Sequence, residues 1–370
     1  MTLVWFAAGL VALVVGAELL VRGASRLAVS LGLSPLVVGL TIVALGTSAP
    51  EIAVSVGAVI SGTTDVAVGN VIGSNIFNVL LVLGASALVT PLAVDSQLIR
   101  QEVPIMIGCS LLLAVLVLDG ELGRTDAALL TLLMVAYLAF LVWQSRVRTR
   151  RRAGRNEADA PAAGHDDAIT RAAHRGWDGH WTVQVGLVAV GLIGLVLGAQ
   201  LLVEAAVAFA RALGVSDLVI GLTVVAAGTS LPEVAASLMA AWRGDRDIAV
   251  GNVVGSCILN ILACLGIAGL VSEAPLSIAQ AVLNFDLWVM VAVAAACLPV
   301  LLTGREIARW EGAIFVGYYA AYTAYLILAA QQHDALAAYS NAMLSFVVPL
   351  TIVTLIAMTI RHPARRSRTP

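Results

Sequence analysis

The sequence predicts an all-α polytopic membrane protein with two inverted five-helix repeats and one additional C-terminal transmembrane helix. Three observations carry this prediction: an apolar composition, a polar segment that divides the chain, and a sequence repeat across that segment. Hydrophobic residues make up 60% of the chain and charged residues only 12%, with a mean hydropathy of +0.96. Soluble domains carry about 25% charged residues. Soluble enzymes, secreted disulfide scaffolds and disordered proteins are therefore excluded as classes.

Eleven apolar stretches are long enough to cross a bilayer, since a spanning helix needs about 20 residues. The expected spans lie at about 2–22, 34–60, 66–90, 101–118, 125–145, 182–210, 215–242, 247–271, 281–303, 309–330 and 341–360. The N-terminal stretch lacks the basic region and cleavage site of a signal peptide, so we interpret it as the first span.

Arginine placement predicts the orientation, because cytoplasmic loops collect basic residues. The polar segment 146–181 holds eight arginines and is expected to be a flexible cytoplasmic linker. With eleven spans, 19 of the 21 arginines face the cytoplasm, and only Arg124 and Arg211 lie outside. A ten-span chain would place the tail arginines on the wrong side. We therefore expect a multi-pass protein of the cell (inner) membrane with its N-terminus outside and its C-terminus in the cytoplasm.

The two halves of the chain repeat each other at a constant offset of 182 residues. Residues 39–84 align with residues 221–266 without a gap, and 27 of the 46 positions are identical. Five spans in each half are an odd number, so the second half enters the membrane from the opposite side, which gives an inverted repeat. The expected divisions are 1–145 for the first repeat, 146–181 for the linker, 182–330 for the second repeat and 341–360 for the additional helix.

Polar residues shared by the two halves indicate the candidate site, because polar side chains are expensive inside a bilayer. Gly-Thr-Ser-x-Pro-Glu occurs at 46–51 and 228–233, and Gly-Asn-Val-x-Gly-Ser-x-Ile-x-Asn at 69–78 and 251–260. Glu51 and Glu233 fall deep within their spans. An ionised carboxylate there needs a cation, or else it must be protonated.

Neutral oxygens accompany both glutamates. Pro50 and Pro232 lack an N–H and free the carbonyls four residues back, at Gly46 and Gly228. The neighbouring carbonyls of Ala44 and Ala226 are expected to turn inward where the helix is broken. The predicted metal ligands are Glu51, Glu233, Thr47, Ser48, Thr229, Ser230, Ser74, Ser256, Asn78, Asn260 and the carbonyls of Ala44 and Ala226. Such an all-oxygen set suits calcium or sodium and offers no His or Cys pair for zinc or copper. No cofactor is expected beyond these transported ions.

Structural interpretations compete with this one. Glycine and serine at helical spacing commonly serve helix packing, prolines kink membrane helices for structural reasons, and a buried glutamate can be a protonated hydrogen-bonding residue. Their joint recurrence in both halves favours a functional site. Glu18 and Glu204 lie near span ends and are interpreted as interface residues, with an ion-pathway role open, as it is for Asp286.

The duplicated motifs closely resemble those of the cation/calcium antiporter superfamily, specifically its prokaryotic sodium/calcium exchanger branch. The resemblance covers spans one to ten and implies ten core helices, central cation sites formed by the ligands named above, and alternating access by sliding of the first helix of each half. Three features depart from the family pattern. Asn260 stands where potassium-dependent relatives carry Asp, Cys257 stands where Asn is usual, and the span at 341–360 exceeds the usual ten.

The expected function is secondary active sodium/calcium antiport that is electrogenic and potassium-independent, and the protein is not expected to be an enzyme. A calcium/proton antiporter is the nearest alternative, because both glutamates can carry protons. A passive cation channel and a purely structural or receptor-like membrane protein are the others. The expected partners are calcium, sodium, protons in the alternative, and the lipid bilayer, with no nucleic acid and no assigned oligomeric state.

Overall fold

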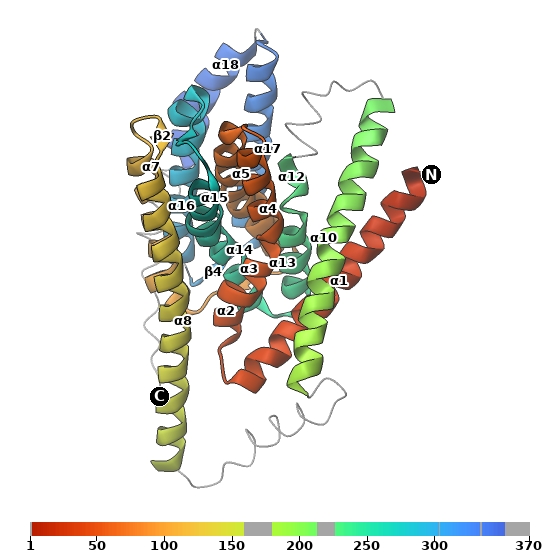
Figure 1. The fold of residues 1–370 in the computed structure, drawn as a ribbon, viewed down its shortest axis with the longest axis vertical. Coiled ribbons are helices and arrows are strands. Elements are labelled where there is room, and N and C mark those ends of the chain that lie inside the picture. Colours follow the sequence, from red (N-terminus) through yellow and green to blue (C-terminus); the bar gives the residue numbers. More distant parts are fainter. Residues whose placement is uncertain (1, 159–179, 213–225, 303, 334, 352–370) are drawn as a thin grey trace.

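The computed structural model describes residues 2–158, 180–212, 226–302, 304–333 and 335–351, which form a bundle of helices (Figure 1). Eight helices in these ranges are long and apolar enough to cross a membrane: Leu3–Leu31, Thr64–Val89, Leu98–Leu116, Arg124–Val147, Trp181–Ala212, Arg246–Val271, Val282–Leu302 and Arg309–Ala330. The pair Pro35–Thr47 and Ala49–Ile60, bent by 41°, supplies a ninth candidate. The predicted class, an all-α membrane protein, is confirmed.

The expected count of eleven spans is not confirmed. Two of the expected spans, 215–242 and 341–360, run into residues 213–225 and 352–370, which lie outside the described part of the chain. The described portion of the last one belongs to an apolar helix at Ala335–Thr351 that is shorter than a full span.

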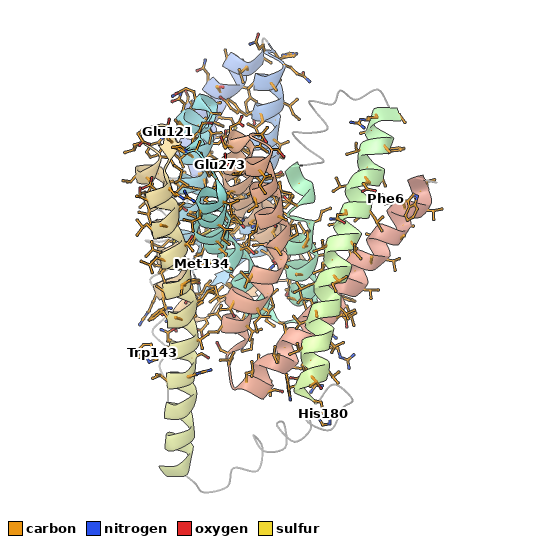
Figure 2. All side chains as sticks on the ribbon, viewed as in Figure 1. Phe6, Glu121, Met134, Trp143, His180 and Glu273 are labelled. Atoms are coloured by element: carbon orange, nitrogen blue, oxygen red, sulfur yellow. The ribbon has the colours of Figure 1, made fainter. Side chains whose placement is uncertain are left out.

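The outer surface of the bundle is apolar, as a lipid-facing surface requires. Large hydrophobic side chains are exposed on several spans, including Leu132 at 65% and Trp143 at 62%. Phe6 on the first helix and Trp143 lie at the outer margins of the bundle (Figure 2). Such exposure would be costly in water and is favourable in hydrocarbon.

The helices of the first half are α1 (Thr2–Leu31), α2 (Pro35–Val38), α3 (Ala44–Thr47), α4 (Ala49–Ile60), α5 (Thr64–Phe77), α6 (Gly84–Val89), α7 (Val103–Leu116) and α8 (Arg124–Ala158). Those of the second half are α10 (Trp181–Ala212), α12 (Ala226–Gly228), α13 (Leu231–Arg243), α14 (Arg246–Leu259), α15 (Gly266–Val271), α16 (Leu287–Leu302) and α17 (Arg309–Ala330), followed by α18 (Ala335–Ala342). The π-helical segments are η1 (Gly39–Val43), η2 (Asn78–Leu83), η3 (Leu98–Glu102), η5 (Asn260–Leu265), η6 (Val282–Asp286) and η7 (Met343–Val347).

The bounds of these elements repeat as the sequence does. Both ends of α5 and α14 differ by 182 residues, and so do both ends of η2 and η5 and of α6 and α15. The offset grows to 184 at η3 and η6, because the loop before η6 is two residues longer. The repeated motifs therefore occupy equivalent helices in the two halves.

Helices α1 and α10 form a two-helix layer at one side of the bundle (Figure 1). They run antiparallel, since Gly9 faces Gly198 while Leu20, later in α1, faces Gly191, earlier in α10. A Cβ atom on Gly191 would lie 2.5 Å from the backbone nitrogen of Leu20. Glycine at these positions lets the two backbones approach closely, as small residues do between membrane helices.

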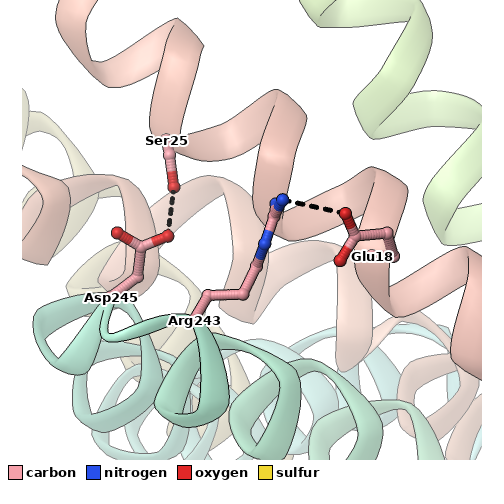
Figure 3. Close-up of polar contacts among 4 residues, drawn as sticks. All are labelled: Glu18, Ser25, Arg243 and Asp245. Atoms are coloured by element: carbon pink, nitrogen blue, oxygen red, sulfur yellow. Dashed lines mark hydrogen bonds and ion pairs between the residues drawn. The ribbon is translucent and has the colours of Figure 1, made fainter.

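Two polar contacts join α1 to the end of α13 (Figure 3). Glu18 Oε1 lies 2.9 Å from a guanidinium nitrogen of Arg243, and Ser25 Oγ donates to Asp245 Oδ2 at 2.8 Å. The Glu18 and Arg243 side chains are 36% and 31% exposed, so solvent screening limits the ion pair to about 0–1 kcal/mol. Glu18 thus lies at an interface between helices.

Two short strand pairs tie loops of the two halves together. β1 (Leu92–Ala93) pairs antiparallel with β4 (Glu306–Ile307), and β2 (Glu121–Leu122) pairs antiparallel with β3 (Leu276–Ser277). In each pair an apolar residue faces another apolar residue, and all four are buried. The sequence analysis assigns no strand here, because a two-residue alternation is too short to recognise.

Helix α8 continues beyond the span expected for it. A flexible linker is expected to begin at residue 146, whereas α8 runs to Ala158 and projects from the bundle (Figure 1). The expectation of flexibility is wrong for residues 146–158. These residues are rich in arginine, which is a good helix former. The apolar span therefore ends where the arginines begin, but the helix continues. The rest of the linker, 159–179, lies outside the described residues.

The close glycine contacts predict that α1–α10 packing is sensitive to side-chain volume. Gly191→Leu should lower the free energy of unfolding by about 1–3 kcal/mol, because its side chain would overlap the α1 backbone. Gly186→Leu on the same helix is the matched control, since a Cβ atom there meets no atom within 4 Å. Unfolding temperatures of the purified variants in detergent check this, and equal losses for both variants would contradict it.

Candidate functional site

Each candidate glutamate lies in the first turn of a helix that begins at a break. Ser48 precedes α4 with φ −80° and ψ 1°, and Glu51 follows within the first turn. Ser230 and Glu233 occupy the same positions before and in α13. Proline in each first turn costs no hydrogen bond, because the first N–H groups of a helix have no partner within it. The helix N-terminus also favours a carboxylate.

The serine that precedes each of these helices donates a hydrogen bond to the glutamate of the other half. Ser48 and Ser230 stand at N-cap positions, yet neither hydroxyl caps its own helix. Ser48 Oγ donates instead to Glu233 Oε1 at 3.3 Å, and Ser230 Oγ donates to Glu51 Oε1 at 3.0 Å. All four side chains are fully buried. The structure therefore brings the glutamates of the two halves to one place, with each held by the serine of the other half.

Three further oxygens gather around Glu233. Ser256 Oγ on α14 lies 3.4 Å from Glu233 Oε1 and 3.5 Å from Thr47 Oγ1. Thr47 Oγ1 also lies 3.1 Å from Asn252 Oδ1. Thr47, Ser256 and Asn252 are fully buried. On this side of the site every hydroxyl has a hydrogen-bond partner.

The side of Glu51 is less fully bonded. Ser230 Oγ lies 3.2 Å from Ser74 Oγ as well as near Glu51. Within the described part of the chain, Thr229 Oγ1 and both amide atoms of Asn78 are buried without a hydrogen-bond partner. Buried polar atoms without a partner are costly, so these atoms are positioned to bind something besides the protein.

The second oxygen of each carboxylate is also free. Glu51 Oε2 and Glu233 Oε2 are buried and have no hydrogen-bond partner among the described residues. Two buried carboxylates with one open oxygen each can share a cation, which would remove both the mutual repulsion and the cost of desolvation.

The two candidate amides are held unequally. Asn78 and Asn260 are the first residues of the π-helical segments η2 and η5. Asn260 Nδ2 donates to Asn75 Oδ1 at 3.2 Å, which leaves its own Oδ1 with only a weak contact from Cys264 Sγ at 3.6 Å. Cys257 stands at the position equivalent to Asn75 and offers no amide to Asn78. The departure at Cys257 therefore affects the hydrogen bonding of a candidate ligand.

The carbonyl of Ala44 remains within the helical hydrogen-bond ladder. It accepts the Ser48 N–H at 2.9 Å and lies 3.4 Å from Thr47 Oγ1. The helix breaks after this carbonyl, at Ser48, and the inward turn of the Ala44 carbonyl toward an ion stays a prediction. A carbonyl oxygen has a second lone pair. Ala226 begins α12, and its side chain lies outside the described atoms.

Sequence reasoning missed two hydrogen-bonded pairs next to the site, one buried and one partly buried. Asn252 Nδ2 donates to Ser237 Oγ at 2.9 Å, and Asn70 Nδ2 donates to Ser55 Oγ at 3.3 Å. The two asparagines are 182 residues apart, as are the two serines, so all four are polar residues shared by the two halves. That recurrence was the available signal. The pairs connect α13 with α14 and α4 with α5.

The donor set suits a hard cation and little else. No group of three or more His, Cys, Asp or Glu side chains comes together among the described residues. Charge at this site comes from Glu51 and Glu233, with hydroxyl and amide oxygens around them. Asp286, another acid within a span, instead accepts a hydrogen bond from Tyr322 Oη at 2.7 Å.

Comparisons with known proteins agree with this architecture. The family model described as sodium/calcium exchanger protein matches residues 1–143 and 183–328. The chain is 35% identical over 337 residues to the sodium/calcium exchanger MaX1 of Methanosarcina acetivorans, covering 85% of this chain and 95% of that protein. It is 36% identical over 203 residues to the inner membrane protein YrbG of Escherichia coli, covering 54% of this chain and 58% of that protein.

A solved structure of the sodium-calcium exchanger NCX_Mj, soaked with sodium and without calcium, superimposes with a TM-score of 0.71 at 32% identity. The match covers 89% of this chain and 98% of that chain. The fold is therefore shared along nearly the whole length of that exchanger.

We expect that replacing either buried glutamate removes the stabilisation by calcium without lowering the stability of the calcium-free protein. Glu51→Gln and Glu233→Gln should unfold, without calcium, at or above the temperature of the unsubstituted protein, because a neutral amide of equal size costs less to bury. Calcium should raise the unfolding temperature of the unsubstituted protein but not of the variants. Thermal unfolding in detergent with and without calcium checks this. A large calcium-independent loss of stability in either variant would mean that the glutamates are structural.

Proposed function

Because the chain belongs to the sodium/calcium exchanger protein family, we propose that it is a secondary active antiporter that exchanges sodium for calcium across the membrane. The observation that supports this most directly is the pair of buried carboxylates, one from each half, each with an unpartnered oxygen. Such a site cannot remain empty and ionised at low cost. It therefore favours the exchange of one bound cation for another over passive leakage.

The proposed metal ligands are those of the sequence prediction. Two hydrogen-bonded groups already hold five of them: Glu233 accepts from Ser48 and Ser256, and Glu51 accepts from Ser230. The other proposed side-chain ligands are Thr47 on α3, Ser74 on α5, Thr229 at the break before α13, Asn78 in η2 and Asn260 in η5. Calcium takes six to eight oxygen ligands in a flexible arrangement, so two carboxylates with neutral oxygens meet its requirement.

Charge balance supports electrogenic exchange. One calcium ion neutralises both glutamates, whereas more than two sodium ions would leave the loaded protein positive. The neutral hydroxyl and amide oxygens offer places for such additional monovalent ions. Asn260 is neutral, so the site lacks the third acid that potassium-dependent relatives carry, and we propose that exchange is independent of potassium.

The packing supports alternating access by movement of α1 and α10. The two helices pack backbone to backbone through their glycines and stand at one side of the bundle (Figure 1). They can therefore move as one body past the helices that bear the ligands. The ion pair between Glu18 and Arg243, which is weak because it is partly exposed, would not prevent this movement.

Vesicle flux tests the proposed exchange. Proteoliposomes loaded with sodium should take up calcium when external sodium is diluted, and imposed potassium or proton gradients without sodium should not replace the sodium gradient. Uptake should respond to membrane potential. Uptake driven by a proton gradient alone would establish the calcium/proton alternative. Calcium flux without any counter-ion would establish a channel.

Substitution of the glutamates separates transport from structure. Glu51→Gln and Glu233→Gln should lower sodium-driven calcium uptake at least tenfold, because the remaining single charge no longer balances calcium. The matched control is Glu273→Gln, an exposed loop residue, which should transport like the unsubstituted protein. Uptake is compared at equal amounts of folded protein in the vesicles. Normal uptake by either site variant would contradict the proposed ligand roles.

We also propose that the N-terminus lies outside and the C-terminus in the cytoplasm. The arginine distribution supports this orientation, and the strand pairs support the placement of the loops that they join on the same side of the membrane. β1 and β4 join two loops that this orientation places in the cytoplasm, while β2 and β3 join two loops that it places outside.

Labelling of introduced cysteines tests the orientation. The four native cysteines are buried, so a membrane-impermeant thiol reagent should report on an added one. Asp119→Cys, in an exposed loop, should react in intact cells, whereas Ala162→Cys, in the linker, should react only after permeabilisation. The reverse pattern would invert the orientation.

A further inference from the structure

Asn252 occupies a position between three helices around the candidate site. Its Nδ2 donates to Ser237 Oγ on α13 at 2.9 Å, and its Oδ1 lies 3.1 Å from Thr47 Oγ1 at the end of α3. Ser237 follows Glu233 by one turn on α13. Asn252, Ser237, Thr47 and Glu233 are all fully buried, so water cannot replace these contacts.

The orientation of the Asn252 amide determines where the proton of Thr47 points. A threonine hydroxyl has one proton and two lone pairs, and it can bind a cation only through a lone pair. Because Ser237 engages Nδ2, the amide presents Oδ1 to Thr47, and Oδ1 can only accept. The closest acceptor for the Thr47 proton is therefore Asn252 Oδ1, ahead of Ala44 O at 3.4 Å and Ser256 Oγ at 3.5 Å. The lone pairs of Thr47 are left for a ligand.

The equivalent arrangement in the other half is incomplete. Asn70 Nδ2 reaches Ser55 Oγ at the longer distance of 3.3 Å, and Asn70 is only half-buried. Thr229, the counterpart of Thr47, has no hydrogen-bond partner within the described residues. The same residues at the same offset thus orient one threonine and leave the other unoriented.

We infer that Asn252 is a positioning residue for ion binding: it holds the Thr47 hydroxyl with its lone pairs available to a sodium ion, and Asn70 performs no such role for Thr229. This inference rests on the proposed sodium/calcium exchange. A monovalent ion gains less from the two carboxylates than a divalent ion does, so it depends more on correctly oriented neutral oxygens. Loss of the orientation should therefore weaken sodium binding first.

Matched alanine variants test this. Asn252→Ala should raise the sodium concentration that half-saturates calcium exchange about five- to tenfold, which is the effect of losing one buried hydrogen bond. The maximal rate at saturating sodium should stay within about twofold. Asn70→Ala should shift half-saturation less than about twofold. Proteoliposomes with equal amounts of folded protein give both quantities.

A double-mutant cycle distinguishes positioning from a general structural effect. In a Thr47→Val background, where no hydroxyl remains to be oriented, Asn252→Ala should add less than about a twofold shift. Ser237→Ala, which releases the amide without removing it, should shift sodium half-saturation in the same direction as Asn252→Ala. This milder variant decides the matter if Asn252→Ala fails to fold.

The outcomes separate this inference from the proposed function. If the unsubstituted protein shows no sodium-driven calcium exchange, the proposed function fails. If it exchanges normally but Asn252→Ala and Asn70→Ala shift sodium half-saturation equally, or the shift persists in the Thr47→Val background, the positioning role is wrong. A fall in the maximal rate without a shift in half-saturation would contradict it equally.

Discussion

The rest of the structure depends on one constraint: two carboxylates are buried where no water can hydrate them. Glu51 and Glu233 are fully enclosed, and each accepts a hydrogen bond from a serine of the other half. Burial of ionised groups is tolerated only when charge and hydrogen bonds compensate it. The helix starts, the crossed serines and the surrounding hydroxyls supply the neutral part of that compensation. A cation shared by the two free carboxylate oxygens would supply the charge, and this is why the site can bind an ion and cannot easily stay empty.

Duplication explains how one chain brings such a site together, but the two halves are not equivalent. Around Glu233, Thr47 and Asn260 are oriented by the amides of Asn252 and Asn75. Around Glu51, the counterparts Thr229 and Asn78 have no partner among the described residues. Asn78 lacks a partner of this kind because Cys257, the counterpart of Asn75, has no amide group. The polar side chains of one half are thus held by hydrogen bonds, and those of the other half keep unpartnered atoms among the described residues.

Most of the candidate site was predictable from the sequence because polar residues are rare in membrane spans. Residues such as Glu51 and Ser48 stand out against an apolar background, and their recurrence in the second half predicted that they meet. Hydrogen-bond geometry was not predictable: the Ala44 carbonyl accepts the Ser48 N–H within the helical ladder, because the helix breaks at Ser48 and not before it. The roles of Asn252 and Ser237 depend on distances between helices, which spacing along one helix does not contain. Helix α8 continues beyond its apolar stretch because arginine, although polar, is a good helix former.

The central claim is that one cation binds between the two glutamates. The most direct measurement is the anomalous scattering of strontium, a heavier analogue of calcium, in crystals of the protein soaked with and without it. The account predicts a strontium peak within coordination distance of both Glu51 and Glu233, with oxygens of Ser48, Ser230 or the neighbouring hydroxyls completing the shell, and loss of that peak in competition with excess calcium. A peak that contacts only one glutamate, or strontium bound solely elsewhere on the protein, would contradict it.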